Sequence, residues 1–190
     1  MILLRHGQTV FNAVFTETRI DPGVADPCLT GLGRDQARAA ADALAAEGVR
    51  RIVASPYLRA LETAEIVAAA LDVPVSVDVR VRERMAFSCD VGSPRSALAA
   101  RWPGWRFDAV EEMWWPESEE PLDSLFARCG AFCAAMAAED DWRDVAVITH
   151  WGVIRALTGV RAPNGAHLRI DPCTASVPHP GCTLVPSPDP

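Results

Sequence analysis

Short apolar runs alternate with helical patterns in this chain, and this alternation limits the possible folds more than any other feature. Residues 1–5, 51–55 and 73–77 are brief apolar runs of the kind found in strands buried on both faces. Between them, residues 30–46 and 58–71 carry apolar side chains at helical spacing. This order predicts an α/β fold, a three-layer α/β/α sandwich with a mostly parallel central sheet.

Boundary residues and later segments extend the pattern. Thr30 stands where it can cap the first helix, and Pro56 precedes the second. Residues 123–138 predict a further helix, 144–148 an apolar strand and 153–157 a short helix. Three segments near the C-terminus are candidate strands: residues 167–170, 174–177 and 182–185.

Residues 84–122 interrupt this regularity with four prolines and a cluster of four tryptophans. We predict an irregular insertion that lies over the sheet edge and the active site, with tryptophans that pack into a core or lid. A chain of 190 residues suits one well-buried core. We therefore expect a single domain over residues 1–190, with residues 84–122 as its cap.

Composition narrows the range of partners. The formal net charge is −7 and the sequence contains no lysine, so an anionic ligand must be held by a local cluster of arginine and histidine. We expect no nucleic acid partner. No apolar run is long enough for a signal peptide or a membrane span, so no membrane partner is expected. The six cysteines form no CxxC pair and predict buried thiols in a reducing cytoplasm.

Three of the expected strands end in residues that carry chemistry: Arg5 and His6, Ser55 with Arg59 one helical turn later, and Thr149 with His150. The carboxyl ends of parallel strands meet in one crevice, where open α/β proteins bind their ligands. Two histidines and two arginines would therefore converge, a set that suits a tetrahedral dianion such as phosphate.

A histidine can attack phosphorus when a backbone carbonyl holds its other ring nitrogen, and we predict this role for His6. Arg5, Arg59 and His150 would neutralise the phosphoryl oxygens, so we expect neither a metal nor another cofactor. Two neighbours complete the predicted phosphate site: Gly7, which would let the backbone approach the phosphate, and Asn12, which would donate an amide hydrogen. Taken singly, His6 would fit a core histidine better and Arg59 an exposed helix arginine better; their position in the chain together favours the phosphate site.

Four segments in order resemble motifs of the histidine phosphatase superfamily, also called phosphoglycerate mutase-like: residues 4–12 (LRHGQTVFN), 29–37 (LTGLGRDQA), 54–64 (ASPYLRALETA) and 147–150 (VITH). The resemblance implies that His6 is phosphorylated and that Arg5, Asn12, Arg59 and His150 bind phosphate. The main departure is Trp151, where many members have glycine. A side chain of this size affects the pocket more than the chemistry.

The resemblance also implies a carboxylate that protonates the leaving oxygen and then activates water, and Glu83 stands at that position. Crowding by phosphate and partial burial would raise its pKa, as a general acid requires. Arg82 and Arg84 would oppose this rise if they face the same way. We interpret residues 117–120, by contrast, as a solvated acidic face.

The resulting hypothesis is a phosphomonoesterase that acts on a small phosphorylated metabolite through a phosphohistidine. One alternative is a phosphoglycerate mutase, which returns the phosphoryl group to its substrate. The modest length of the chain favours hydrolysis. The other alternative is a non-catalytic phosphate-binding regulatory module, which the presence of His6, Arg5, Arg59, His150 and Glu83 together disfavours.

Overall fold

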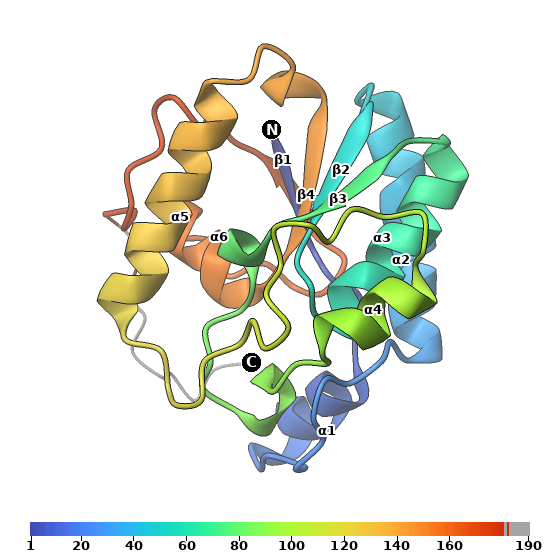
Figure 1. Cartoon of the computed structure of the whole chain (residues 1–190), viewed down its shortest axis with the longest axis vertical. Helices are drawn as coiled ribbons and strands as arrows, with labels where there is room; N and C mark the ends of the chain where they lie inside the picture. Colours follow the sequence, from blue (N-terminus) through green and yellow to red (C-terminus); the bar gives the residue numbers. More distant parts are fainter. Residues whose placement is uncertain (181, 183–190) are drawn as a thin grey trace.

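The computed structural model describes residues 1–180 and 182, which contain one five-stranded sheet in the order β3-β2-β4-β1-β5 (Figure 1). The strands are β1 (Ile2–Arg5), β2 (Arg51–Ala54), β3 (Val75–Val77), β4 (Val145–Thr149) and β5 (His167–Arg169). The first four run parallel, and β5 pairs antiparallel with β1. The prediction of a mostly parallel sheet is confirmed.

Helices cover both faces of this sheet. They are α1 (Val10–Thr18), α2 (Gly31–Ala46), α3 (Leu58–Leu71), α4 (Arg95–Arg101), α5 (Leu122–Ala137) and α6 (Trp151–Thr158). Along β1, Ile2 and Leu4 pack with α2 and α3, whereas Met1 and Leu3 pack with α5 and α6, because neighbouring strand residues point to opposite faces. Figure 1 shows these helix pairs on opposite sides of the sheet, as the predicted α/β/α sandwich requires.

Two local predictions need correction. Residues 10–18 form α1, which the pattern analysis did not predict; Thr9 caps it in a reciprocal capping box with Asn12. Residues 174–177 contain no strand. The Asp171 side chain accepts a hydrogen bond from the Cys173 amide in a turn that directs the chain away from the sheet. Of the candidate strand at 182–185, residues 183–185 lie outside the described residues.

The insertion lies along the β3 edge, as expected. Arg106 forms a parallel bridge with Ser76, and its carbonyl accepts a hydrogen bond from the Val77 amide at 3.3 Å. Trp102 and Trp114 are buried in the core on the α2 and α3 side, which agrees with the expected packing role. The segment is not wholly irregular, because it contains α4 and the 3-10 turn η2 (Ser88–Asp90).

Two further sequence predictions can be compared with the structure. Cys89, Cys129 and Cys133 are buried as expected, but Cys28 and Cys173 are exposed, since both lie on surface loops. Among residues 1–180 and 182, no helix is long and apolar enough to cross a membrane.

Candidate active site

The sheet order brings the three chemically distinctive strand ends together. β4 lies between β1 and β2, and its register pairs Thr149 with Arg5 and Ile148 with Ala54. The residues that follow these strands continue the pairing, because the His6 amide donates to the Thr149 carbonyl at 3.0 Å and the Ser55 amide to the Ile148 carbonyl at 3.0 Å. His6, Ser55 and His150 therefore lie side by side at the carboxyl edge of the sheet.

His6 is held as a neutral imidazole with one defined tautomer. Its Nδ1 lies 2.7 Å from the Gly7 carbonyl oxygen, which can only accept, so Nδ1 carries the proton and Nε2 carries the lone pair. The pKa of His6 is well below its usual value because of burial and the nearby positive charges of Arg59 and Arg5. This is the form that a nucleophilic imidazole needs.

His150 is also fixed as one tautomer. Arg59 Nε donates to His150 Nδ1 at 3.3 Å, and a guanidinium cannot accept, so the ring proton lies on Nε2 and is donated to Ser55 Oγ at 2.7 Å. The rings of His6 and His150 are 5.0 Å apart between centroids. Because both nitrogens of His150 already have protein partners, a direct contact with phosphate would require one of them to change partner.

Arg59 is a buried residue, not an exposed helix arginine. Its guanidinium lies over the Tyr57 ring, 4.2 Å from the centroid, and donates to the Cys89 carbonyl at 2.7 Å and to Asp90 Oδ1 at 2.9 Å. Asp90 and Cys89 belong to the insertion, and sequence reasoning missed both. No local pattern marks them as partners of a residue on α3.

Arg5 and Asn12 each present donors near His6. Arg5 Nη1 donates to the Ala162 carbonyl at 2.7 Å, while Arg5 Nε is buried without a partner in the described part of the chain. Burial lowers the pKa of Arg5 to about 10. The Asn12 Oδ1 accepts from the Thr9 amide at 3.1 Å and from Asn164 Nδ2 at 3.3 Å, and the same Nδ2 donates to the His6 carbonyl. These contacts engage the oxygen of Asn12 and leave its NH₂ group as a donor.

Glu83 is held by two backbone amides and has a raised pKa. Its Oε1 accepts from the Arg84 amide at 2.8 Å and its Oε2 from the Gly152 amide at 3.1 Å. Burial raises the pKa of Glu83, and the negative charge of Asp90 adds to the rise. A raised pKa favours the protonated carboxyl that a general acid requires.

The arginines that flank Glu83 bind carboxylates other than that of Glu83, although Arg82 Nη1 also donates to the Glu83 backbone carbonyl at 3.2 Å. Arg82 donates to both oxygens of Glu120, at 2.8 and 3.0 Å, and Arg84 contacts Glu119 and the Glu120 carbonyl. Burial alone would raise the pKa of Glu120, but hydrogen bonds from Arg128 and Arg82 outweigh it and lower the pKa to about 2. The interpretation of residues 117–120 as a solvated face is therefore wrong for Glu120, which is 2% exposed because these arginines bind it.

Two glycines in the motifs serve close packing. A Cβ on Gly7 would overlap the carbonyl oxygen of Gly33 at the start of α2, so the glycine permits contact between two backbone segments. Gly7 thus has a packing role in addition to its predicted role beside phosphate. A Cβ on Gly152 would overlap Glu83 Oε1. Trp151, beside it, packs its ring 5.3 Å from the Arg155 guanidinium.

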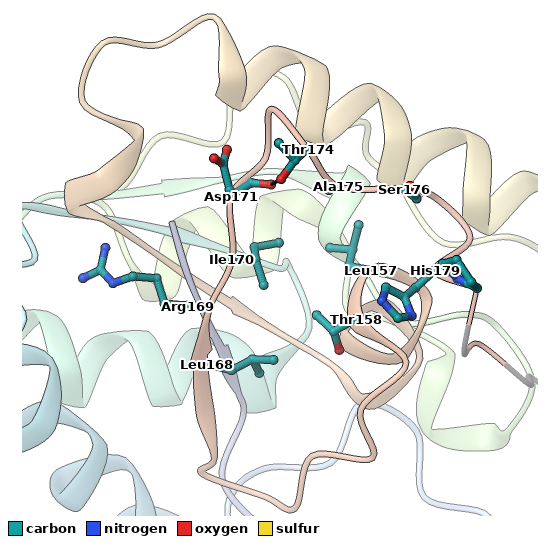
Figure 2. A pocket seen from close by; sticks show the side chains of 11 residues that line it. Leu157, Thr158, Leu168, Arg169, Ile170, Asp171, Thr174, Ala175, Ser176 and His179 are labelled. Atoms are coloured by element: carbon teal, nitrogen blue, oxygen red, sulfur yellow. Dashed lines mark hydrogen bonds between the residues drawn. The ribbon is translucent and has the colours of Figure 1, made fainter.

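A groove elsewhere on the molecule contains none of these residues. Figure 2 shows it between the end of α6, β5 and the segment that follows β5, with a volume of about 460 Å³. Its lining includes Leu157, Leu168, Asp171 and His179. The groove is separate from the candidate active site, and we assign it no function.

Among residues 1–180 and 182, no group of three or more His, Cys, Asp or Glu side chains could hold a metal ion.

Comparisons with known proteins agree with this geometry. The family model of the histidine phosphatase superfamily (branch 1) matches residues 1–179, and the chain belongs to this superfamily. A glucosyl-3-phosphoglycerate phosphatase of Mycolicibacterium vanbaalenii is 34% identical over 173 residues, covering 83% of this chain and 72% of that protein. Phosphoglycerate mutase-like protein 4 of Arabidopsis thaliana is 30% identical over 161 residues, covering 83% and 68%.

A solved structure supports the same assignment. The mycobacterial glucosyl-3-phosphoglycerate phosphatase in complex with VO3 superposes with a TM-score of 0.60 at 30% identity, covering 87% of this chain and 82% of that one. The fold and the sequence therefore indicate the same superfamily.

Proposed function

We propose that this protein hydrolyses phosphate monoesters of a small metabolite through a phosphohistidine on His6. The observation that carries the proposal is the hydrogen bond of 2.7 Å between His6 Nδ1 and the Gly7 carbonyl, which directs the ring lone pair to Nε2. The nearby positive charges of Arg59 and Arg5 act on this ring, and we assign Asn12 to phosphate binding and Glu83 to proton transfer. Similarity to phosphatases of the superfamily supports the same chemistry.

The reaction takes two steps. His6 Nε2 attacks phosphorus, the bond between phosphorus and the ester oxygen breaks, and Glu83 donates its proton to the departing alkoxide. Glu83, now a carboxylate, takes a proton from water as that water attacks the phosphohistidine. The P–N bond breaks, phosphate leaves, and both residues return to their starting forms. Arg5 and Arg59 stabilise the phosphoryl oxygens throughout.

Hydrolysis and mutase activity share these groups and differ only in what accepts the phosphoryl group. The resemblance to a phosphoglycerate mutase-like protein makes the mutase a real alternative. We expect free phosphate to be the product from a panel of phosphorylated metabolites that includes glucosyl-3-phosphoglycerate and 3-phosphoglycerate. A coupled mutase assay that detects 2-phosphoglycerate without phosphate release would contradict hydrolysis. A protein that binds phosphate but turns over no ester would support the regulatory module.

Three further features belong to the proposal. Residues 1–190 act as one domain whose cap is residues 84–122, a view supported by the packing of Trp102 and Trp114 into the core of the sheet. The activity needs no metal, because arginine side chains supply the positive charge; it should survive EDTA, and loss with recovery on Mg²⁺ or Zn²⁺ would contradict this. The protein works in the cytoplasm, where buried thiols such as Cys129 stay reduced.

A further inference from the structure

The insertion contributes one buried carboxylate to the candidate active site, that of Asp90 at the end of η2. Asp90 is 1% exposed, and its Oδ1 lies 2.9 Å from Arg59 Nη2 in an ion pair whose side chains are both buried. Its Oδ2 accepts from the backbone amides of Ala86 and Phe87, each at 3.1 Å. The carboxylate is therefore tied to its own turn and to Arg59 at once.

The rest of the turn also contacts this arginine. Arg59 Nη1 donates to the Cys89 carbonyl at 2.7 Å, and the Tyr57 hydroxyl donates to the Asp90 carbonyl at 2.6 Å. A guanidinium has five N–H donors, of which the protein engages the one on Nε and one on each Nη. Within residues 1–180 and 182, this leaves one N–H on each Nη open to a ligand.

The contact of Asp90 with Arg59 also reaches His150. Arg59 Nε donates to His150 Nδ1, and His150 Nε2 donates to Ser55 Oγ at 2.7 Å. Asp90, Arg59, His150 and Ser55 thus form a continuous chain of hydrogen bonds from the insertion to the end of β2. A change at Asp90 would move the guanidinium and release the constraint on the His150 tautomer.

We propose that Asp90 is a positioning residue for phosphate binding, one that holds Arg59, and through it His150, in the orientation that directs the free guanidinium donors at the phosphoryl oxygens. The inference rests on the proposed function of the site. An arginine side chain loses substantial rotamer entropy when it is immobilised, and a partner that fixes it beforehand removes this cost from substrate binding. The insertion is then part of the phosphate site and not only its cover.

Asp90→Asn tests the proposal because it keeps the shape of the side chain and removes its charge. We expect kcat/KM to fall by about 10²-fold, mainly through a higher KM and weaker inhibition by inorganic phosphate, as for a misplaced binding group. In an Arg59→Ala background the same substitution should change kcat/KM by less than about twofold, because its partner is gone. Asp108→Asn is the matched control: this insertion residue has an 82% exposed side chain, and activity should stay unchanged.

Equal losses from Asp90→Asn in both backgrounds, with KM unchanged, would mean that Asp90 only supports the fold, and would overturn the proposal. Asp90→Glu covers the case in which Asp90→Asn does not fold. It keeps the charge, but its extra methylene displaces the guanidinium, so KM should rise about tenfold. A wild-type KM in folded Asp90→Glu also overturns the inference. A wild-type protein that hydrolyses no phosphomonoester refutes the proposed function instead.

Discussion

The strand ends and the insertion both contribute to the candidate site, but they contribute different chemical groups and are held in place differently. The strand ends and the start of α3 supply nitrogen groups, those of His6, Arg5, Arg59 and His150. The insertion and the residue before it supply carboxylates, those of Glu83, Asp90 and Glu120. Backbone pairing of β1, β2 and β4 places the strand-end residues of the first set, and helix α3 carries Arg59. Backbone amides and buried arginines place the second.

This difference shows how an irregular segment can be part of a precise site. A strand end is held in place by backbone hydrogen bonds, which form whatever side chain the residue carries. Around Asp90 and Glu120 the insertion has no strand pairing. One backbone hydrogen bond, from the Glu120 amide to the Met85 carbonyl at 2.9 Å, adds to ion pairs that are costly to break when buried. Substitutions at strand ends should therefore affect chemistry without affecting stability, whereas substitutions in the insertion should affect both.

The largest effect is expected at the strand ends. His6→Ala should lower kcat by at least about 10³-fold, because no covalent intermediate can form, while the free energy of unfolding stays close to that of the wild type. Steady-state kinetics and urea denaturation measure the two quantities. His167→Ala is the control, since that side chain pairs with Glu47 away from the site. Residual activity above a few per cent, or a labelled phosphoenzyme on a serine or cysteine, would identify another nucleophile.

Glu120→Gln should produce the largest loss of stability from the insertion side. It removes the buried carboxylate that pairs with Arg82 and Arg128, whose side chains are each only 11% exposed, and we expect the free energy of unfolding to fall by about 3–5 kcal/mol. Denaturant titration of wild type and variant at neutral pH measures the difference. Glu119→Gln, whose side chain is 68% exposed, is the matched control and should have little effect.

The pH dependence of that difference sharpens the test. The pKa of Glu120 is lowered from 4.5 to about 2, so the folded state binds its proton later than the unfolded state as pH falls. Its stabilisation is fully present above the unfolded value and is lost as pH falls through the folded one. The difference in the free energy of unfolding between the wild type and Glu120→Gln should therefore shrink over this pH window. A gap that is independent of pH would show that lost packing, not charge, causes it.

Glu83→Gln should slow alkyl phosphates by about 10²-fold, the usual contribution of general acid–base catalysis. Aryl phosphates should lose less in the transfer step, because their oxygen leaves without a proton, and phosphohistidine should accumulate. Since the pKa of Glu83 is raised, the wild type should keep this carboxyl protonated to higher pH than an ordinary carboxyl. The pH–rate profile of the wild type should fall as Glu83 loses its proton, and the profile of Glu83→Gln should lack this fall. Burst and steady-state kinetics across pH give both readouts.

Glu112→Gln is the control for this prediction, because that side chain lies on the surface of the insertion and bonds to Ser96. Equal and small losses for alkyl and aryl esters, with no accumulation of phosphoenzyme, would assign the proton to another carboxylate such as Glu111.

The smallest expected effect is that of Gly152→Ala, in which the new methyl group pushes Glu83 aside. We expect about a tenfold loss of kcat with alkyl phosphates and less with aryl phosphates, since only the proton donor moves. Gly130→Ala in α5 is the matched control, because its methyl group meets no other atom within 4 Å. Equal losses on both ester types would indicate a general disturbance of the site.

Much of the fold was predictable because its signals are local. The strands β1, β2 and β4 and the helices α2, α3 and α5 follow from apolar spacing within single segments. The pattern analysis did not predict helix α1, whose start is set by the capping box between Thr9 and Asn12. The strand predicted at 174–177 failed because alternation alone does not reveal the turn at Asp171.

The sequence by itself determined which residues are candidates for the chemistry, since His6 and His150 follow strands, and Arg59 begins a helix, that local patterns predict. Only the tertiary structure decided what holds them. Asp90 lies 31 residues from Arg59 in the sequence, and Ser55 lies 95 residues from His150. Such pairings depend on the path of the insertion and on the order of strands in the sheet. Both are set by packing between distant segments, which produces no periodic pattern in the amino-acid sequence.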